Sequence, residues 1–124
     1  MSVWTNDELE QIGAADELQL ASARADGTLR KPVTIWVVRQ GDDLYVRAVG
    51  GRTSPWFRGT QDRHEGHIES GGIEKDVSFA DADDDVHDQI DAAYRAKYHR
   101  YPAQYVDPTV TPQARTATLK VMPR

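Results

Sequence analysis

The chain has 124 residues, of which 39% are hydrophobic and 28% are charged, and its formal net charge is -5. This length supports one folded domain, residues 1–124, and the composition is globular rather than disordered. An acidic chain lacks the clustered positive face that a phosphate backbone requires, so no nucleic-acid partner is expected. The absence of cysteine excludes disulfides, thiolate metal ligands and a cysteine nucleophile.

The N-terminal residues show no basic segment followed by an apolar run, so the sequence predicts no secretory signal. Nor does any apolar stretch approach the length needed to span a membrane. These two observations predict a cytoplasmic protein with no membrane partner.

The first half of the chain predicts one helix followed by strands. Thr5 and Glu8 have the spacing of a capping box, and Gly13 predicts the end of that helix. Asp26-Gly27 is typical of a hairpin turn. Alternating, β-branched and aromatic residues predict strands over 17–22, 32–39 and 44–49.

The second half alternates helical and strand patterns. Helices are predicted over 55–65, 83–98 and 111–115. Strands are predicted over 67–70, 73–79 and 116–121. The whole pattern indicates the α+β class, with about six antiparallel strands and three or four short helices, most simply arranged as a small, partly open barrel.

The most informative stretch is the segment 50–59, which follows a predicted strand. Its paired glycines allow a sharp turn, and Ser54 followed by Pro55 is typical of a helix start. The unpaired amides of such a start attract anions, phosphate above all. The residues placed around this anion are Gly51, Arg52, Thr53, Ser54 and Arg58, with Trp56 and Phe57 as adjacent apolar surface. The alternative interpretation is a capped surface helix with core aromatics and solvated arginines.

A second basic cluster, Arg30 and Lys31, precedes the predicted strand over 32–39. Hairpins bring the start of one strand close to the end of its neighbour, so this cluster is expected near Arg47 and Arg52. Two converging cation clusters would bind a phosphate firmly, with arginine making bidentate contacts. The alternative is that these side chains are simply solvated.

Other motifs indicate no further chemistry. His64 and His67 match no metal-binding spacing, so no metal site is predicted. Ser54 lacks the sequence context of a nucleophile. Tyr94 is predicted to lie in the core, whereas Tyr98 and Tyr101 stay open as candidates, and no catalytic residue is assigned.

Two segments carry a resemblance to known proteins. Gly27-x-x-Arg30-x-Pro32-Val33, followed by Gly50-Gly51 and Ser54-Pro55-Trp56-Phe57-Arg58, resembles the flavin-binding split-barrel superfamily, and within it the deazaflavin-dependent nitroreductases. The chain as a whole, including 93–98 and 114–119, resembles a small bacterial domain-of-unknown-function family, number 2255.

The resemblance implies a six-stranded split barrel, usually a homodimer, with FMN or a deazaflavin bound in a groove at the dimer interface. By the same resemblance Thr34 and Trp36 lie near the cofactor ring. The residues implied to hold the cofactor phosphate are Arg30, Lys31, Gly51, Arg52, Thr53 and Ser54.

The predicted function is a flavin- or deazaflavin-binding oxidoreductase that transfers hydride to or from a small organic substrate. Trp36, Trp56 and Phe57 would line its pocket, and Arg47 or Arg58 would stabilise negative charge on the reduced cofactor. Two alternatives stay open: a cofactor-free enzyme of small-molecule, natural-product metabolism that uses the same pocket, and a non-catalytic dimeric binding module.

Overall fold

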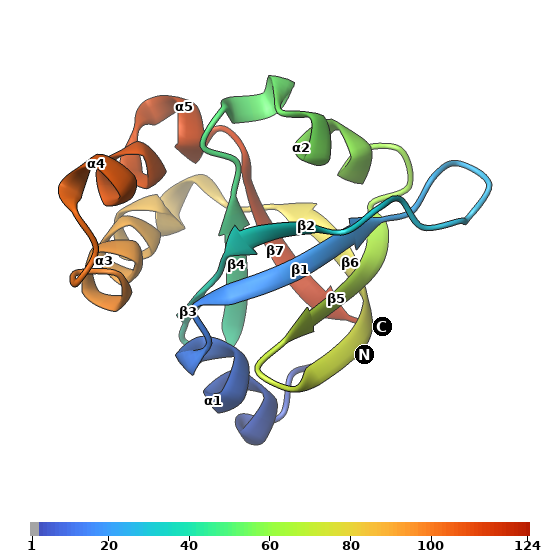
Figure 1. The fold of residues 1–124 in the computed structure, drawn as a ribbon, viewed down its shortest axis with the longest axis horizontal. Coiled ribbons are helices and arrows are strands. Elements are labelled where there is room, and N and C mark those ends of the chain that lie inside the picture. The colour runs from blue at the N-terminus through green and yellow to red at the C-terminus, as the bar shows by residue number, and fades with distance from the viewer. Residues whose placement is uncertain (1–2) are drawn as a thin grey trace.

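A computed structural model describes residues 3–124, whose seven strands form one antiparallel sheet (Figure 1). The order across the sheet is β2-β1-β5-β6-β7-β4-β3. The strands are β1 (Glu17–Ser22), β2 (Val33–Trp36), β3 (Val38–Gln40), β4 (Asp43–Arg47), β5 (Glu65–Ser70), β6 (Ile73–Asp81) and β7 (Thr118–Pro123). The fold is therefore the predicted α+β class with an antiparallel, nearly closed barrel.

Barrel closure depends on one long strand that is broken at Val37. The segment predicted as a single strand over 32–39 divides there into β2 and β3, so the barrel has seven strands instead of the predicted six. β2 pairs with β1, and β3 pairs with β4. Because these two strands form opposite edges of the sheet yet are consecutive in the chain, the two edges meet.

Where the strand is broken, two side chains at the C-terminal end of the helix His87–Lys97 form hydrogen bonds with the backbone of Val37. The amide of Val37 donates to the hydroxyl of Tyr98 at 3.2 Å, and the carbonyl of Val37 accepts from Nζ of Lys97 at 2.6 Å. The ring of Tyr98 stacks on Trp36 with centroids 3.8 Å apart and planes within 4°. We call Trp36, Val37, Lys97 and Tyr98 the strand-break clasp.

Five α-helices cover the barrel within residues 3–124: α1 (Asn6–Ala14), α2 (Pro55–Thr60), α3 (His87–Lys97), α4 (Ala103–Val106) and α5 (Pro112–Arg115). In Figure 1, α1 and α2 lie at opposite ends of the barrel, and α3, α4 and α5 gather along one side. Short 3-10 turns occupy Gly51–Thr53, Asp84–Val86 and Asp107–Val110.

The predicted helices differ from the observed ones mainly at their ends. The capping box of Thr5 and Glu8 is confirmed, and α1 runs one residue past Gly13 to Ala14. The helix predicted over 55–65 ends at Thr60, and His64 then adopts a φ of 58° that no helix continues through. The segment 103–110, for which no element was predicted, contains α4 and a 3-10 turn.

Two apolar clusters hold the fold together. One fills the barrel and includes Leu18, Val46 and Leu119, each fully buried. The other packs α3 against the outer face of β3 and β4 and includes Tyr94 and Tyr98. Among the described residues, no helix has the length and apolar character required to cross a bilayer.

Candidate functional site

A groove with a volume of about 310 Å³ lies between β2, the end of β4, the start of α2 and the segment of α3 and α4. Its rim carries exposed side chains, including Val49 at 48% and Tyr105 at 56% exposure. Half-buried Trp36 and Trp56 line its walls. Its buried inner end, the floor, is formed by Arg47, Tyr94 and Thr109.

The groove brings together five of the predicted ligand-binding residues from three separate segments of the chain. β2 supplies Thr34 and Trp36, β4 supplies Arg47, and the start of α2 supplies Ser54 and Trp56. The floor residues Tyr94 and Thr109 and the rim residues Val49 and Tyr105 were not among the predicted ligand-binding residues.

Arg47 lies in the floor with its guanidinium occupied by the protein. Nε donates to the hydroxyl of Thr118 at 2.9 Å, and Nη1 donates to the carbonyl of Thr109 at 2.9 Å and to the carboxylate of Asp91. Nη2 lies 3.2 Å from Nδ1 of His87. The side chain is completely buried, so it connects β4 to α3 and offers no free fork to an incoming phosphate.

The ionisation of the groups around Arg47 agrees with this structural role. Burial alone would raise the pKa of Asp91, but hydrogen bonds from Arg115 and Arg47 outweigh it and hold that pKa below its ordinary value. Burial, and then the charge of Arg47, lower the pKa of His87. The imidazole is therefore neutral at neutral pH, and its Nδ1 accepts from the guanidinium.

Arg30 and Arg58 lie in a second pocket of about 320 Å³, next to Pro55 at the start of α2. Arg30 donates to the carbonyl of Gly59 at 3.2 Å and pairs with the carboxylate of Asp62. Arg58 is exposed. The predicted convergence of Arg30 with Arg47 is therefore wrong: the two guanidiniums line different pockets and pair with different carboxylates.

The Gly-Gly turn before α2 is packed against α5. Gly51 has a φ of 79°, and a Cβ there would lie 2.6 Å from Cγ of Gln113. Nε2 of Gln113 donates to the carbonyl of Gly50 at 2.8 Å. Glycine is thus required at Gly51 by its backbone angle and by its neighbour, and the outer side of the turn is filled by protein.

The start of α2 lies where it was predicted. Ser54 occupies the N-cap position and Pro55 begins the helix, but the side chain of Ser54 does not make the capping hydrogen bond that was expected of a serine at this position. Arg52 donates to the carbonyl of Thr116 at 2.8 Å and lies over the ring of Phe57, which is buried in the barrel core. Lys31 and Thr53 are exposed and line neither the groove nor the Arg30 pocket.

Tyr94 is buried in the second apolar cluster, as predicted, but it also reaches the groove floor. Its hydroxyl is a buried polar atom with no hydrogen-bond partner among the described residues. Burial raises its pKa well above the ordinary value, although the charge of Arg47, and its backbone amide facing the hydroxyl oxygen, act in the opposite direction and leave the hydroxyl hydrogen unused. The phenol therefore stays protonated and keeps a proton to donate.

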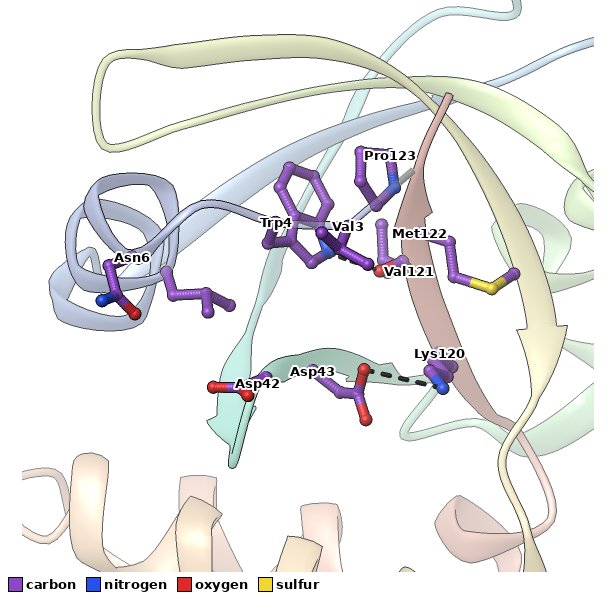
Figure 2. A pocket seen from close by; sticks show the side chains of 10 residues that line it. Val3, Trp4, Asn6, Asp42, Asp43, Lys120, Val121, Met122 and Pro123 are labelled. Carbon is purple, nitrogen blue, oxygen red and sulfur yellow. Dashed lines mark hydrogen bonds and ion pairs between the residues drawn. The ribbon is translucent and has the colours of Figure 1, made fainter. Parts of the chain in front are cut away.

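Another cavity, of about 400 Å³, lies beside α1 and is lined in part by Trp4, Asp43 and Lys120 (Figure 2). Asp43 and Lys120 form an ion pair at 3.5 Å, and the indole of Trp4 donates to the carbonyl of Val121 at 2.9 Å. None of the twelve predicted ligand-binding residues lines this cavity.

Histidines and carboxylates do not form a metal centre in the part of the chain that the structure describes. His67 lies on the outer face of the sheet, with Nδ1 2.9 Å from Asp76 and Nε2 3.0 Å from Glu74. The hydrogen bond to Asp76 is the main reason why the pKa of His67 is raised.

The architecture is a split barrel of the kind seen in F420-dependent reductases. A structure of an F420-H2-dependent reductase (FDR-A) superposes with a TM-score of 0.61 at 13% identity, covering 86% of this chain and 93% of that one. The conserved hypothetical protein Rv2991 from Mycobacterium tuberculosis gives 0.61 at 11% identity, with 98% and 80% covered. The FAD and heme binding protein from Mycobacterium smegmatis gives 0.55 at 17% identity, with 98% and 66% covered.

At these identities the likeness establishes the fold and nothing finer. The chain belongs to the bacterial family described as "Uncharacterized protein conserved in bacteria (DUF2255)", which matches residues 8–121. No curated protein matches the chain significantly.

Proposed function

We propose that this protein binds a flavin or a deazaflavin in the groove and is an oxidoreductase that transfers hydride to or from a small organic substrate. One observation carries the proposal. Trp36 and Trp56, which are distant in the sequence, line one groove in a barrel whose structural neighbours include F420-dependent reductases. When bound, such a cofactor supplies the redox chemistry, and the protein supplies binding and orientation.

The groove suits a planar ring. Its two tryptophans offer flat apolar surface, Thr34 and Ser54 offer hydroxyls, and no carboxylate side chain within residues 3–124 lines it. Arg47, the one cationic side chain that lines it in this part of the chain, is already neutralised by Asp91. A ring with low net charge is therefore favoured over a strongly ionic ligand.

The phosphate of the cofactor would lie outside the groove, beside Arg58 and Arg30. These side chains line the second pocket together with Pro55, which stands in the chain between the groove residues Ser54 and Trp56. Arg58 is the stronger anchor because it is exposed, whereas Arg30 is engaged with Asp62 and with backbone carbonyls.

We further propose that the protein acts as a homodimer. Val49 and Tyr105 leave apolar surface exposed at the rim of the groove, and a second copy placed there would shield the bound ring from water. A dimer whose interface does not include this rim would not shield the ring and would contradict this part of the proposal.

Titration separates the proposal from its alternatives. Purified protein is examined for visible absorbance and for copurifying small molecules by mass spectrometry, and is then titrated with FMN and with F420. Binding of either cofactor supports the proposal. If neither binds and another small molecule copurifies, a cofactor-free enzyme is favoured; if a stable dimer holds no ligand, a binding module is favoured.

The phosphate anchor is tested by comparing FMN with riboflavin, which lacks the phosphate. In Arg58→Ala the affinity for FMN should fall about 10-fold, the loss of one charge-assisted contact, and the affinity for riboflavin should not change. Arg95→Ala is the matched control, because Arg95 is exposed and pairs with Asp107, away from α2. Equal losses for both ligands would place the phosphate elsewhere.

A further inference from the structure

Two buried tyrosines, Tyr94 in α3 and Tyr98 at its C-cap, differ in the hydrogen bonding of their hydroxyls. Tyr94 and Tyr98 are one helical turn apart and are 1% and 0% exposed. The hydroxyl of Tyr98 donates to the carbonyl of Asp16 at 2.6 Å and accepts from the amide of Val37. The hydroxyl of Tyr94 has no partner among the described residues.

A buried hydroxyl without a partner destabilises a fold, since it gives up its hydrogen bonds to water and gains none. Phenylalanine would fill the same volume without that penalty. Tyr94 lines the groove floor beside Arg47, whose guanidinium carbon lies 5.6 Å from the centre of the Tyr94 ring. The ring that carries the unmatched donor therefore lines the inner end of the groove.

We propose that the hydroxyl of Tyr94 donates a hydrogen bond to a carbonyl oxygen on the edge of the bound ring, so that the groove selects planar rings edged with carbonyl acceptors. This inference rests on the proposed function and adds the residue that recognises the ring. The ligand must supply an acceptor there, because the phenol retains its proton and the neighbouring guanidinium disfavours a cationic or donor group of the ligand at that place.

The selectivity follows from the geometry of the floor. The donors of Arg47 are used by Thr109, Thr118, Asp91 and His87, which leaves Tyr94 as the unsatisfied donor of the floor within residues 3–124. A ring of the same shape without an acceptor at its edge would leave the hydroxyl unpaired and gain only from stacking. Recognition by one donor in an otherwise satisfied floor therefore discriminates among flat ligands.

The test uses full-length protein, FMN and F420, and three variants. In Tyr94→Phe, the affinity for whichever cofactor binds the wild type should fall about 10-fold, the value of one buried hydrogen bond. The melting temperature of the ligand-free variant should be equal to or above that of the wild type. The infrared carbonyl stretch of the bound ring should move to higher frequency, because a hydrogen bond to that carbonyl is lost.

Two variants serve as controls. Tyr45→Phe alters a tyrosine of the same apolar cluster that does not line the groove, so it should leave the affinity unchanged. Tyr98→Phe removes a satisfied hydroxyl and should lower the melting temperature. Together they separate a loss of recognition from a loss of folding.

The outcomes distinguish the two proposals. If the wild type binds FMN or F420 and Tyr94→Phe binds it equally well with the same carbonyl stretch, the inference is overturned and the proposed function stands. The Tyr94 hydroxyl would then donate to a buried water molecule and not to the ring. If the wild type binds neither cofactor, both the inference and the proposed function are overturned.

Discussion

The strand-break clasp and the groove floor are neighbouring regions served by the same helix, and they treat buried polar groups in opposite ways. In the clasp, the hydroxyl of Tyr98 and the amine of Lys97 satisfy the backbone of Val37. In the floor, the hydroxyl of Tyr94 is left without a partner. The difference separates a polar group that the fold needs from one that the fold merely tolerates.

This comparison distinguishes structure from function without reference to any relative. A satisfied buried hydroxyl contributes to stability, and removing it strands its partners at a cost of about 1–3 kcal/mol. A buried hydroxyl without a partner adds no stability to the ligand-free protein, so its presence points to a role in binding a ligand. Variants of the floor, the clasp and the helix starts test this difference.

The largest effect is expected at Arg47, the floor residue that is already satisfied. Arg47→Met removes one partner of a buried ion pair and leaves Asp91 with Arg115 alone. The free energy of unfolding should fall by about 3 kcal/mol, measured by urea denaturation. Arg95→Met, which removes an exposed ion pair, should cost less than about 1 kcal/mol. If the two variants lose similar amounts of unfolding free energy, Arg47 has no special structural role and could instead bind an anionic ligand.

A smaller effect is expected at Tyr98. Tyr98→Phe leaves the amide of Val37 without its acceptor and the carbonyl of Asp16 without its donor. The free energy of unfolding should fall by about 2 kcal/mol, whereas Tyr94→Phe should leave it unchanged or raise it. The comparison breaks down if urea denaturation gives the same loss for both variants.

Lys97 gives the clasp a pH dependence. Burial lowers the pKa of Lys97 to about 8 from its ordinary value of 10.5, even with the charge of Asp16 acting in the opposite direction. Between these two values the unfolded chain binds more protons than the folded one, so stability rises with pH. From pH 8 to pH 9.5 the wild type should gain between about 1 and 2 kcal/mol relative to Lys97→Met.

The difference between wild type and Lys97→Met isolates this effect, because His67 and the other titrating groups are common to both proteins. The window ends below pH 10, where tyrosines of the unfolded chain begin to ionise and oppose the gain. A difference that stays constant across the window would mean that the amine of Lys97 keeps its ordinary pKa.

The smallest effect is expected at Ser54. Because its side chain makes no capping hydrogen bond, Ser54→Ala should change the free energy of unfolding by less than about 0.5 kcal/mol. Thr5→Ala is the matched contrast, since Thr5 accepts from the amide of Glu8 at 3.2 Å in a complete capping box, and it should cost about 1 kcal/mol. Thermal unfolding measures both effects. If Ser54→Ala is destabilised more than Thr5→Ala, then Ser54 caps α2 with its side chain and this prediction is wrong.

Local signals in the sequence predicted much of the fold. The structure confirms the strand over 17–22, the capping box of α1 and the turn at Asp26-Gly27. These features could be predicted because each depends on residues only a few positions apart. The break at Val37 could not be predicted, since β-branched residues continue through it without interruption. It arises from Tyr98, which lies 61 residues further along the chain.

The candidate site divides in the same way. The Gly-Gly turn and Trp56 after it marked one wall of the groove, and β2 marked another, whereas Phe57 lies in the barrel core. Arg47 was interpreted as a free cation because its partner Asp91 lies 44 residues away. Tyr105 and Val49 belong to the rim through tertiary packing alone, and Tyr94 was correctly assigned to the core by its spacing, which carries no information about its hydroxyl.

The central claim, that the groove is the ligand site, is tested most directly by NMR of the indole N–H signals of the three tryptophans during titration with FMN and F420. Trp36 and Trp56 line the groove, whereas Trp4 lines the separate cavity beside α1 (Figure 2). We expect the signals of Trp36 and Trp56 to shift with the bound fraction and that of Trp4 to stay in place. A shift of Trp4 alone, or of none of the three, would contradict the account.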